Sequence, residues 1–293
     1  MNHANPPRGP TSPIDAAAMR QRIVEEWTVA ADGWKRWEPF IIAFSWPVTH
    51  HITDALMLSP GQTVLDVGCG IGDPALAVAD RIGPEGRVIA IDPAGAMIDA
   101  ARGRARALGL DHIDFRVIDV EQLDLSPASL DAASGRWSFI FCVDPVAALR
   151  RVRGWLKPGG RLALSTWTPQ HNSPGFAIIN AALNRQVELP PLDPSKPGMQ
   201  HLSEPGQLEA ALTDAGFRDV AVRTVRLSIF ARDGREFWQC MSEMGGSLRK
   251  VLSGLSAEQR AAVQAEVARE VERFACDGVL RIPALAQVGS ARA

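Results

Sequence analysis

The chain has 293 residues, of which 46% are hydrophobic and 22% are charged, a composition typical of a globular protein that can bury a sizeable core. Its formal net charge of −2 provides no electrostatic attraction to nucleic acid or to an anionic membrane surface. We therefore expect neither a nucleic-acid partner nor binding to a membrane surface.

The four cysteines are far apart in the sequence and form no Cys-x-x-Cys pair. This spacing argues against a zinc site and a disulfide framework, and it fits a reducing compartment. Residues 1–13 are rich in proline and lack an apolar core, which predicts a disordered leader and not a signal peptide. No segment reaches the roughly 18 to 20 uninterrupted apolar residues that a membrane span needs. We expect a cytoplasmic protein without a bound metal.

The N-terminal segment, residues 14–58, has a helical pattern and is rich in tryptophan, which predicts a helical cap. The next segment, residues 59–167, alternates strands with helices. Its predicted strands are 64–67, 87–91, 113–119, 130–134 and 161–167. The fourth strand is rich in alanine, a residue of low β-propensity. Strands joined by helical crossovers predict a parallel sheet with helices on both faces, and we expect this segment to be the ligand-binding core.

The C-terminal segment, residues 168–293, has a different pattern. Residues 168–201 contain six prolines and no clear periodicity, which predicts a loop-rich lid. A helix, a strand, a pair of helices and a final strand are then predicted at 204–217, 219–230, 235–276 and 279–291. We expect this segment to supply the lid, the last strands of the core and inserted helices, within one domain overall.

The stretch VLDVGCGIGDP, residues 64–74, carries the clearest functional signal. Glycines 68, 70 and 72 follow a predicted strand and precede a helix that Asp73 can cap, with Pro74 at its first position. Such a loop lets the backbone approach a ligand closely, and the helix N-terminus offers free N–H groups. In open α/β sheets, ligands bind at the carboxyl ends of the strands. We expect a nucleotide-like ligand; the alternative is a tight turn that binds nothing.

The spacing of the glycines separates two classes of nucleotide site. A dinucleotide loop reads G-x-G-x-x-G, whereas here Asp73 stands where the third glycine belongs. The observed D-x-G-x-G-x-G, which begins at Asp66, resembles motif I of the class I S-adenosylmethionine-dependent methyltransferases. Residues 134–167, with KPGG at 157–160, resemble the fourth strand, helix and fifth strand of that family. The likeness runs from about residue 34 to about residue 225 and points to the ubiquinone/menaquinone C-methyltransferase-like branch (methyltransferase type 11).

The resemblance implies a doubly wound, Rossmann-like sheet, mostly parallel with an antiparallel final strand, and helical cap and lid elements at both ends of the chain. It implies S-adenosyl-L-methionine as the cofactor. Asp92, at the end of the second strand, is expected to accept the ribose hydroxyls, although it can also cap the helix that follows Pro93. Asp119 is expected at the adenine, although an Asp in this place is also a common turn former. The cofactor residues that the resemblance implies are Asp66, Gly68, Cys69, Gly70, Gly72, Asp92, Pro93, Met97, Asp119, Val120 and Arg136.

Methyl transfer requires an aligned acceptor, and for some acceptors a general base. The chain has no tyrosine, so His50 and His51 are the candidate bases. Arg136 is expected near the transferred methyl, where it holds an anionic or carbonyl substrate or forms a structural salt bridge. Candidate acceptor-binding residues are Trp34, Trp37, Trp46, Trp137 and His171. The tryptophans in the cap also fit a packing face.

The sequence therefore predicts a methyltransferase that acts on oxygen, carbon or nitrogen of a small apolar or aromatic metabolite. One alternative is an NAD(P)-dependent oxidoreductase, which the glycine spacing disfavours. Another is a non-catalytic module that binds S-adenosylmethionine. A homodimer through the flanking helices is a further possibility. The arginines at 102, 104 and 106 are expected on a solvated helix face.

Overall fold

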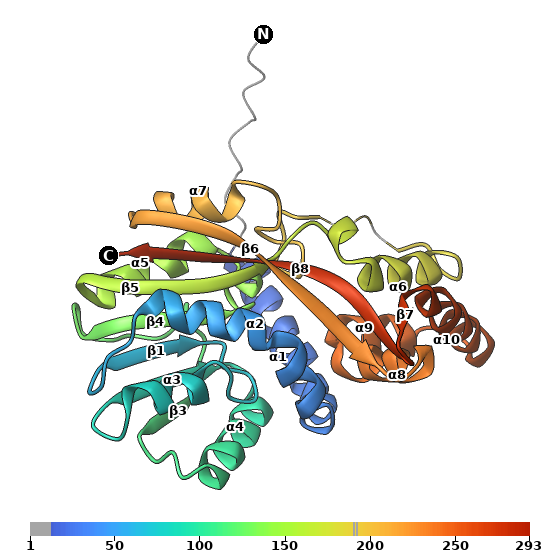
Figure 1. Ribbon diagram of the computed structural model, residues 1–293. Coiled ribbons are helices and arrows are strands. Elements are labelled where there is room, and N and C mark those ends of the chain that lie inside the picture. Colours follow the sequence, from blue (N-terminus) through green and yellow to red (C-terminus); the bar gives the residue numbers. More distant parts are fainter. Residues whose placement is uncertain (1–12, 190, 192) are drawn as a thin grey trace.

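The computed structural model describes residues 13–189, 191 and 193–293, so the predicted leader falls outside the described residues except for Pro13. Within this part of the chain, eight strands form one sheet in the order β3-β2-β1-β4-β5-β8-β6, and β7 pairs with β8 (Figure 1). The strands are β1 Thr63–Val67, β2 Arg87–Asp92, β3 Ile113–Val117, β4 Leu130–Arg136, β5 Leu156–Trp167, β6 Arg218–Ala231, β7 Ala275–Cys276 and β8 Val279–Arg292.

The sheet confirms the predicted Rossmann-like fold. Strands β1 to β5 pair in parallel, and β8 runs antiparallel to both β5 and β6. The strand order reverses between β1 and β4, which places a ligand-binding crevice at the carboxyl ends of β1, β2 and β4. The alanine-rich β4 is a central strand because its neighbours β1 and β5 hydrogen-bond it on both sides, and this pairing outweighs its low propensity.

Helices cover both faces of the sheet. The described helices are α1 Pro13–Arg36, α2 Glu38–Leu56, α3 Ala75–Ile82, α4 Gly95–Ala107, α5 Pro145–Trp155, α6 Pro174–Asn184, α7 Gln207–Asp214, α8 Gly234–Met244, α9 Gly246–Ser253 and α10 Ala257–Val271, with single 3-10 turns η1 Phe139–Phe141, η2 Gln170–Asn172 and η3 Glu272–Phe274. In the described segments no helix combines the length and the apolar character that a membrane span requires.

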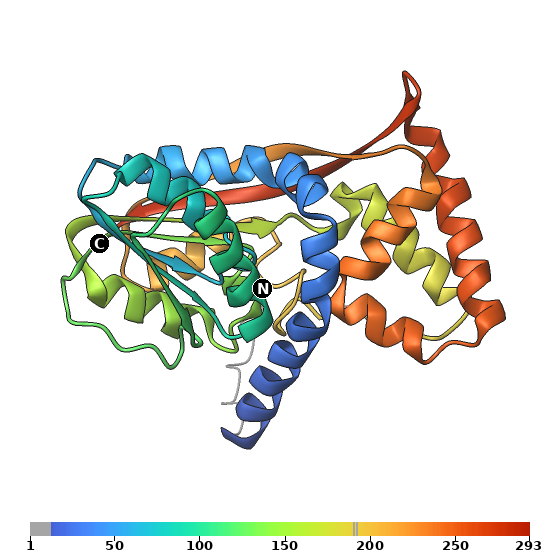
Figure 2. The same cartoon turned by 90° about the horizontal axis from the view of Figure 1, so that it is seen from below.

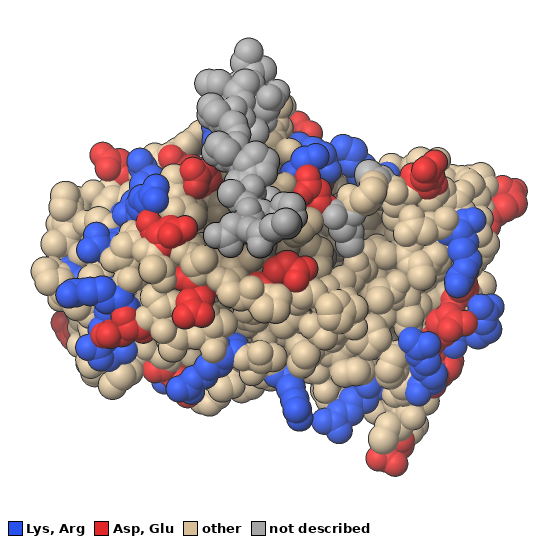
Figure 3. Space-filling model, turned by 90° about the horizontal axis from the view of Figure 1, so that it is seen from above, with Lys and Arg blue, Asp and Glu red and all other residues tan. Residues whose placement is uncertain are grey.

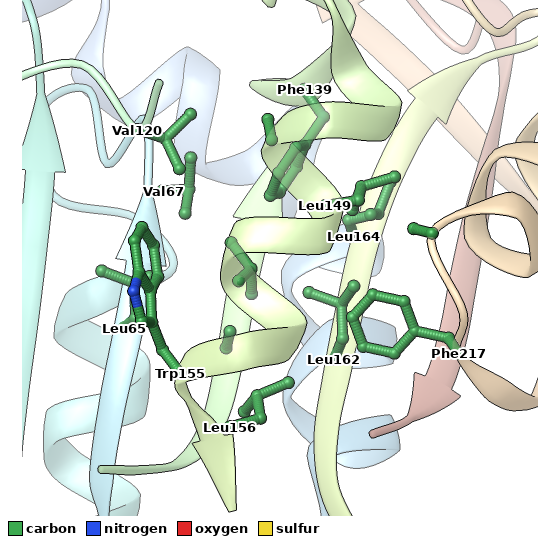
Figure 4. Close-up of a cluster of buried hydrophobic side chains, with 14 of the residues drawn as sticks. Leu65, Val67, Val120, Phe139, Leu149, Trp155, Leu156, Leu162, Leu164 and Phe217 are labelled. Carbon is green, nitrogen blue, oxygen red and sulfur yellow. The ribbon is translucent and has the colours of Figure 1, made fainter. Parts of the chain in front are cut away.

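The alternation of side chains along β1 divides the core between the two faces. Leu65 and Val67 point to the face covered by α5 and α7, where they pack in one cluster with Leu149, Trp155 and Phe217 (Figure 4). Val64 points to the opposite face and joins a cluster built from α2, α3 and α4. A sheet buried on both faces in this way leaves its strand ends as the place where polar groups reach a ligand.

A third cluster joins α1, α6, α8, α9 and α10 around the far ends of β6 and β8. These two strands are 14 residues long and extend well past the parallel sheet, and the helices gather at that end (Figures 1 and 2). The cluster also contains Ile71 of the glycine loop and Ala94 and Met97 at the start of α4. The helical cap therefore packs directly against the loop that the sequence singles out.

Two predicted elements differ from the structure. Residues 235–276 contain three helices and not two, because α8 ends at Met244 with Gly245 as its C-cap and α9 begins at Gly246. A Cβ on Gly246 would meet the Glu26 carbonyl oxygen at 2.6 Å, so this close contact with α1 requires glycine. The predicted loop-rich lid contains the helix α6, whose N-terminus begins at Pro174. The two N-terminal helices, the strand β6 and the final strand β8 lie where they are predicted.

Candidate active site

The glycine loop follows β1 and has two glycines with different roles. Gly68 and Gly70 have positive φ values of 64° and 53°, which favour glycine. A Cβ on Gly68 would meet Ser138 Cβ at 2.4 Å, so Gly68 is required for packing against the segment after β4. A Cβ on Gly70 would meet no heavy atom within 4 Å. The backbone at Gly70 is therefore open to a ligand.

Asp92, at the end of β2, is tied to this loop. Gly70 N donates to its Oδ2 at 3.0 Å, and Ala94 N donates to its Oδ1 at 2.9 Å. Burial raises the pKa of Asp92 to about 6, although both hydrogen bonds oppose the rise. Each carboxylate oxygen keeps a further lone pair, so the side chain can still accept hydrogen bonds from ligand hydroxyls.

Asp66 lies inside the molecule and not on the open side of the loop. Its carboxylate accepts from Ala75 N at 3.0 Å and from Ser134 Oγ at 2.7 Å, which joins β1 to the start of α3 and to β4. Complete burial raises its pKa to about 7. Asp66 thus accepts from the first amide of α3, a bond that Asp73 was predicted to make, and it contacts the ligand region only through the backbone that it holds.

The prediction that residues 102, 104 and 106 share a solvated helix face is wrong for Arg104. Arg102 and Arg106 are exposed, but Arg104 is turned toward the glycine loop with a side chain only 15% exposed. Its Nη1 donates to the Ile71 carbonyl oxygen at 2.8 Å and to Asp73 at 2.7 Å, and its Nε pairs with Glu38 at 2.8 Å. One partly buried guanidinium therefore connects α4, the glycine loop and the first turn of α2.

A cavity of about 330 Å³ lies between α1 and the carboxyl ends of β2 and β3. Pro93, Ile118, Asp119 and Gln122 line one side, and Arg20 is among the α1 residues on the other. Arg20 also pairs with Glu121 at 3.7 Å, which holds α1 over the cavity. The two expected cofactor residues Val120 and Met97 are buried beside this region, in the clusters that pack under it.

Arg136 ends β4 and is held by α2. Its Nη1 donates to Ser45 Oγ and, at 3.0 Å, to Thr49 Oγ1. The residue is 8% exposed, and burial lowers its pKa from the ordinary arginine value. No carboxylate of residues 13–189, 191 and 193–293 lies within ion-pair distance, so the predicted alternative of a structural salt bridge is not formed there.

Stacked aromatic rings lie beside Arg136. The rings of Trp137 and Trp167 are parallel with centroids 4.4 Å apart, and Phe44 of α2 stacks at 5.8 and 5.9 Å from them. Phe176 meets Trp167 edge-on. We name Phe44, Trp137, Trp167 and Phe176 the aromatic wall.

Unsatisfied polar atoms surround this wall. Trp137 Nε1, Ser138 Oγ and Thr166 Oγ1 are buried and have no hydrogen-bond partner among the described residues. Trp137 also has a φ of 54°, a left-handed conformation that a tryptophan rarely adopts. Strain and unsatisfied polar atoms concentrate at binding and catalytic sites, and here they lie just after β4 and among the last residues of β5.

The structure does not bring the other candidate residues to this region. Trp34 Nε1 donates to the Met244 carbonyl oxygen at 3.0 Å and Trp37 Nε1 to Glu243 at 2.8 Å, so both indoles fasten the N-terminal helices to α8. His171 is exposed in η2. Trp34 and Trp37 therefore have the packing role that the sequence offered as the alternative for the tryptophans of the cap.

The candidate bases lie on the solvent face of α2. Trp46 is 55% exposed and stacks on His50, which in turn pairs with Asp54 at 3.2 Å. His51 is exposed as well. The helical repeat explains this placement, because the buried face of α2 carries Ser45 and Thr49 and residues one or two positions later point elsewhere.

Several residues of the site were missed by the sequence reasoning: Ser45, Thr49, Arg104, Ser138, Trp167 and Phe176. Trp167 could have been found, because it ends the fifth strand. If the fifth strand is placed beside the fourth in the predicted parallel sheet, Trp167 lies next to Trp137. The others become neighbours of the site only through packing between distant segments. No pattern within their own segments marks them.

Comparison with known proteins assigns the family. Residues 64–160 match a family model described as a methyltransferase domain. The chain is 33% identical over 169 residues to aklanonic acid methyltransferase DauC of Streptomyces sp. (strain C5), which covers 58% of this chain and 73% of the relative. It is 27% identical to nocamycin O-methyltransferase of Saccharothrix syringae, over 81% of this chain and 87% of the relative.

Solved structures agree on the fold. Phosphoethanolamine N-methyltransferase 2 of Haemonchus contortus, determined in complex with S-adenosyl-L-methionine, superposes with a TM-score of 0.52 at 19% identity, over 98% of this chain and 61% of that chain. The glycine loop, the parallel sheet with its antiparallel final strand and these relatives lead to one assignment. The chain belongs to the class I S-adenosylmethionine-dependent methyltransferases, and it is an enzyme that methylates small molecules.

Proposed function

We propose that this enzyme methylates a flat aromatic small molecule that binds against the aromatic wall. The carrying observation is the stack that Phe44 of α2 forms with Trp137, which follows β4, and with Trp167, the last residue of β5. Flat apolar surfaces with a few buried polar atoms favour aromatic ligands. The relatives named for aklanonic acid and nocamycin support a small-molecule acceptor.

The residues around the glycine loop fit S-adenosylmethionine. Gly70 leaves open space, Asp92 retains lone pairs for the ribose hydroxyls, and the cavity beside Asp119 has room for the adenine. The unsatisfied Ser138 Oγ beside Gly68 gives a polar group of the cofactor a hydrogen-bond partner. We assign the cofactor to these residues and place Asp66 behind them as a positioning residue.

The cofactor supplies a methyl group activated by its sulfonium. The chain's own part is to align the acceptor and to exclude water, and good alignment alone is worth on the order of 7 to 11 kcal/mol. The helical cap closes the site, since Ile71, Ala94 and Met97 pack in its core cluster.

Calorimetry tests this function. The purified protein is titrated with S-adenosylmethionine, S-adenosylhomocysteine, NADH and NADPH, and we expect micromolar binding of the two adenosyl-sulfur ligands alone. Trp167→Leu is then compared with Trp46→Leu, which changes an exposed tryptophan of α2. We expect only Trp167→Leu to raise KM for an aromatic acceptor, by about tenfold, with the affinity for S-adenosylhomocysteine unchanged. Binding of a nicotinamide nucleotide, or equal effects of the two substitutions, would contradict the proposal.

The homodimer and the cytoplasmic location remain predictions. Light scattering coupled to gel filtration measures the mass of the particle, which is 31.6 kDa for one chain. Lys and Arg alternate with Asp and Glu over the face seen in Figure 3, and neither sign forms a continuous patch on it. This distribution supports a small-molecule enzyme without a nucleic-acid partner.

A further inference from the structure

Arg136 is a buried cation whose partners in the protein are neutral. Within the described residues, the hydrogen bonds of its guanidinium come from Nη1 and end on the hydroxyls of Ser45 and Thr49. Its Nη2 and Nε donate to no residue of the described part of the chain. Taking a charge out of water is costly unless an opposite charge accompanies it, so an arginine in this state is suited to an anion from outside the chain.

The nearest acidic groups are committed elsewhere. Asp66 accepts from Ala75 N and Ser134 Oγ, and Asp73 pairs with Arg104. Both lie close enough to stabilise the guanidinium through space, but neither contacts it, and Arg104 adds a positive charge of its own. The positive charge of Arg136 is therefore not neutralised by a carboxylate in direct contact with it.

The Arg136 guanidinium lies next to the aromatic wall, where we propose that the acceptor binds. Its central carbon lies 5.6 Å from the centroid of the Trp137 ring, which belongs to the aromatic wall. The hydroxyls of Ser45 and Thr49 come from successive turns of α2, the helix that also carries Phe44. One helix thus carries a ring of the aromatic wall, Phe44, and the two hydroxyls that hold the Arg136 guanidinium.

We propose that Arg136 binds an anionic oxygen of the acceptor, so that the substrates are aromatic acids: carboxylates, or phenols and enols that ionise readily. The inference deepens the proposed function and rests on it. The flat body of the acceptor lies on the aromatic wall, and the free Nη2 and Nε of Arg136 donate to its anionic oxygens. Arginine suits this role because its planar fork matches a carboxylate with two parallel hydrogen bonds.

Matched pairs of probes test the proposal. Benzoate, 2-naphthoate and anthracene-2-carboxylate are each compared with the corresponding neutral amide, by calorimetry in saturating S-adenosylhomocysteine. We expect at least one carboxylate to bind the wild-type enzyme about tenfold or more tightly than its amide. In Arg136→Gln the preference falls below about twofold while the affinity for the amide is kept, and Arg136→Lys keeps part of the preference. Arg102→Gln, on the exposed face of α4, is the control and keeps the full preference.

A second pair of variants tests the proposal even if Arg136→Gln fails to fold. Ser45→Ala and Thr49→Ala keep the charge but release Nη1, and each should reduce the preference for the carboxylate while thermal unfolding stays cooperative. If no carboxylate binds more tightly than its amide to the wild-type enzyme, the proposal is wrong.

The cofactor itself carries a carboxylate, so a further comparison separates the two sources. If Arg136→Gln weakens S-adenosylhomocysteine about tenfold but leaves 5′-methylthioadenosine unchanged, Arg136 binds the amino-acid end of the cofactor and the proposal is overturned. Failure of the wild-type enzyme to bind S-adenosylhomocysteine at all would instead overturn the proposed function. These readouts keep the two failures distinct.

Discussion

Arg104 and Asp73 form a 2.7 Å ion pair in which both side chains are only 15% exposed. The same guanidinium nitrogen also holds the Ile71 carbonyl oxygen at 2.8 Å. Arg104 therefore holds the loop at Ile71 and Asp73, while Asp92 holds it at Gly70 N. The shape of the loop depends on charged side chains as well as on its glycines.

Replacing Arg104 with Met should loosen the glycine loop without removing any proposed cofactor contact. Hydrogen bonds that involve charged groups contribute about 1.5 to 3 kcal/mol each when buried, so we expect a loss of about 2 kcal/mol in the free energy of unfolding. Affinity for S-adenosylhomocysteine should fall about tenfold because the loop must be reordered on binding. Urea unfolding and calorimetry measure the two effects. Arg106→Met, at an exposed position two residues later on α4, is the control, and equal losses in both variants would contradict the role of Arg104.

Alanine at Gly70 and at Gly68 should fail in different ways. At Gly70 the new Cβ meets no protein atom within 4 Å, so the protein should fold at a cost of about 1 to 2 kcal/mol for the left-handed backbone but bind S-adenosylhomocysteine very weakly. At Gly68 the Cβ collides with Ser138 Cβ at 2.4 Å, so stability should fall further than in Gly70→Ala. Normal cofactor binding by folded Gly70→Ala would show that the ligand does not pass over this glycine.

Binding of the cofactor should weaken in acid. Burial raises the pKa of Asp92 to about 6, and the ionised carboxylate is the form that accepts from ribose hydroxyls most strongly. The Kd for S-adenosylhomocysteine should therefore be constant above pH 7 and rise about tenfold per pH unit below 6. Asp92→Asn should bind weakly at every pH and lose this dependence. Calorimetry from pH 5 to pH 8 gives both profiles, and parallel curves would rule out Asp92 as the titrating group.

Asp66 should make the fold more stable in mild acid than at neutral pH. Its folded pKa of about 7 lies above the ordinary value of 3.8, so the folded state holds the proton more tightly than the unfolded state. This stabilisation is complete below the unfolded pKa and is lost as the pH rises through about 7. Urea unfolding at pH 5 and pH 7.5 should show a larger decrease for the wild-type enzyme than for Asp66→Asn. Asp92, whose pKa is raised in the same direction, contributes equally to both proteins and cancels in the comparison.

The family and the cofactor loop could be predicted from the sequence because their signals are local. Glycines at alternate positions, Asp66 within β1, Asp92 at the end of β2, and the period of the strands and helices all lie within short segments. Backbone geometry imposes these residue types wherever the segment folds, so a single stretch carries enough information. The parallel core followed from the same reasoning, whereas the antiparallel last strand was expected from the family resemblance.

The aromatic wall, where we propose that the acceptor binds, was decided by tertiary packing. Helical tryptophans such as Trp34 face α8, whereas Trp137, Trp167 and Phe44 meet only because β4 and β5 are neighbours and α2 crosses their ends. Arg104 and Arg106 look alike in the sequence, yet only Arg104 meets Asp73, 31 residues away. Contacts between distant segments depend on how whole elements pack, and no local pattern records which face of a helix will be covered. The sequence by itself therefore determined what kind of enzyme this is, and only the folded structure decided which side chains gather at the ends of β4 and β5.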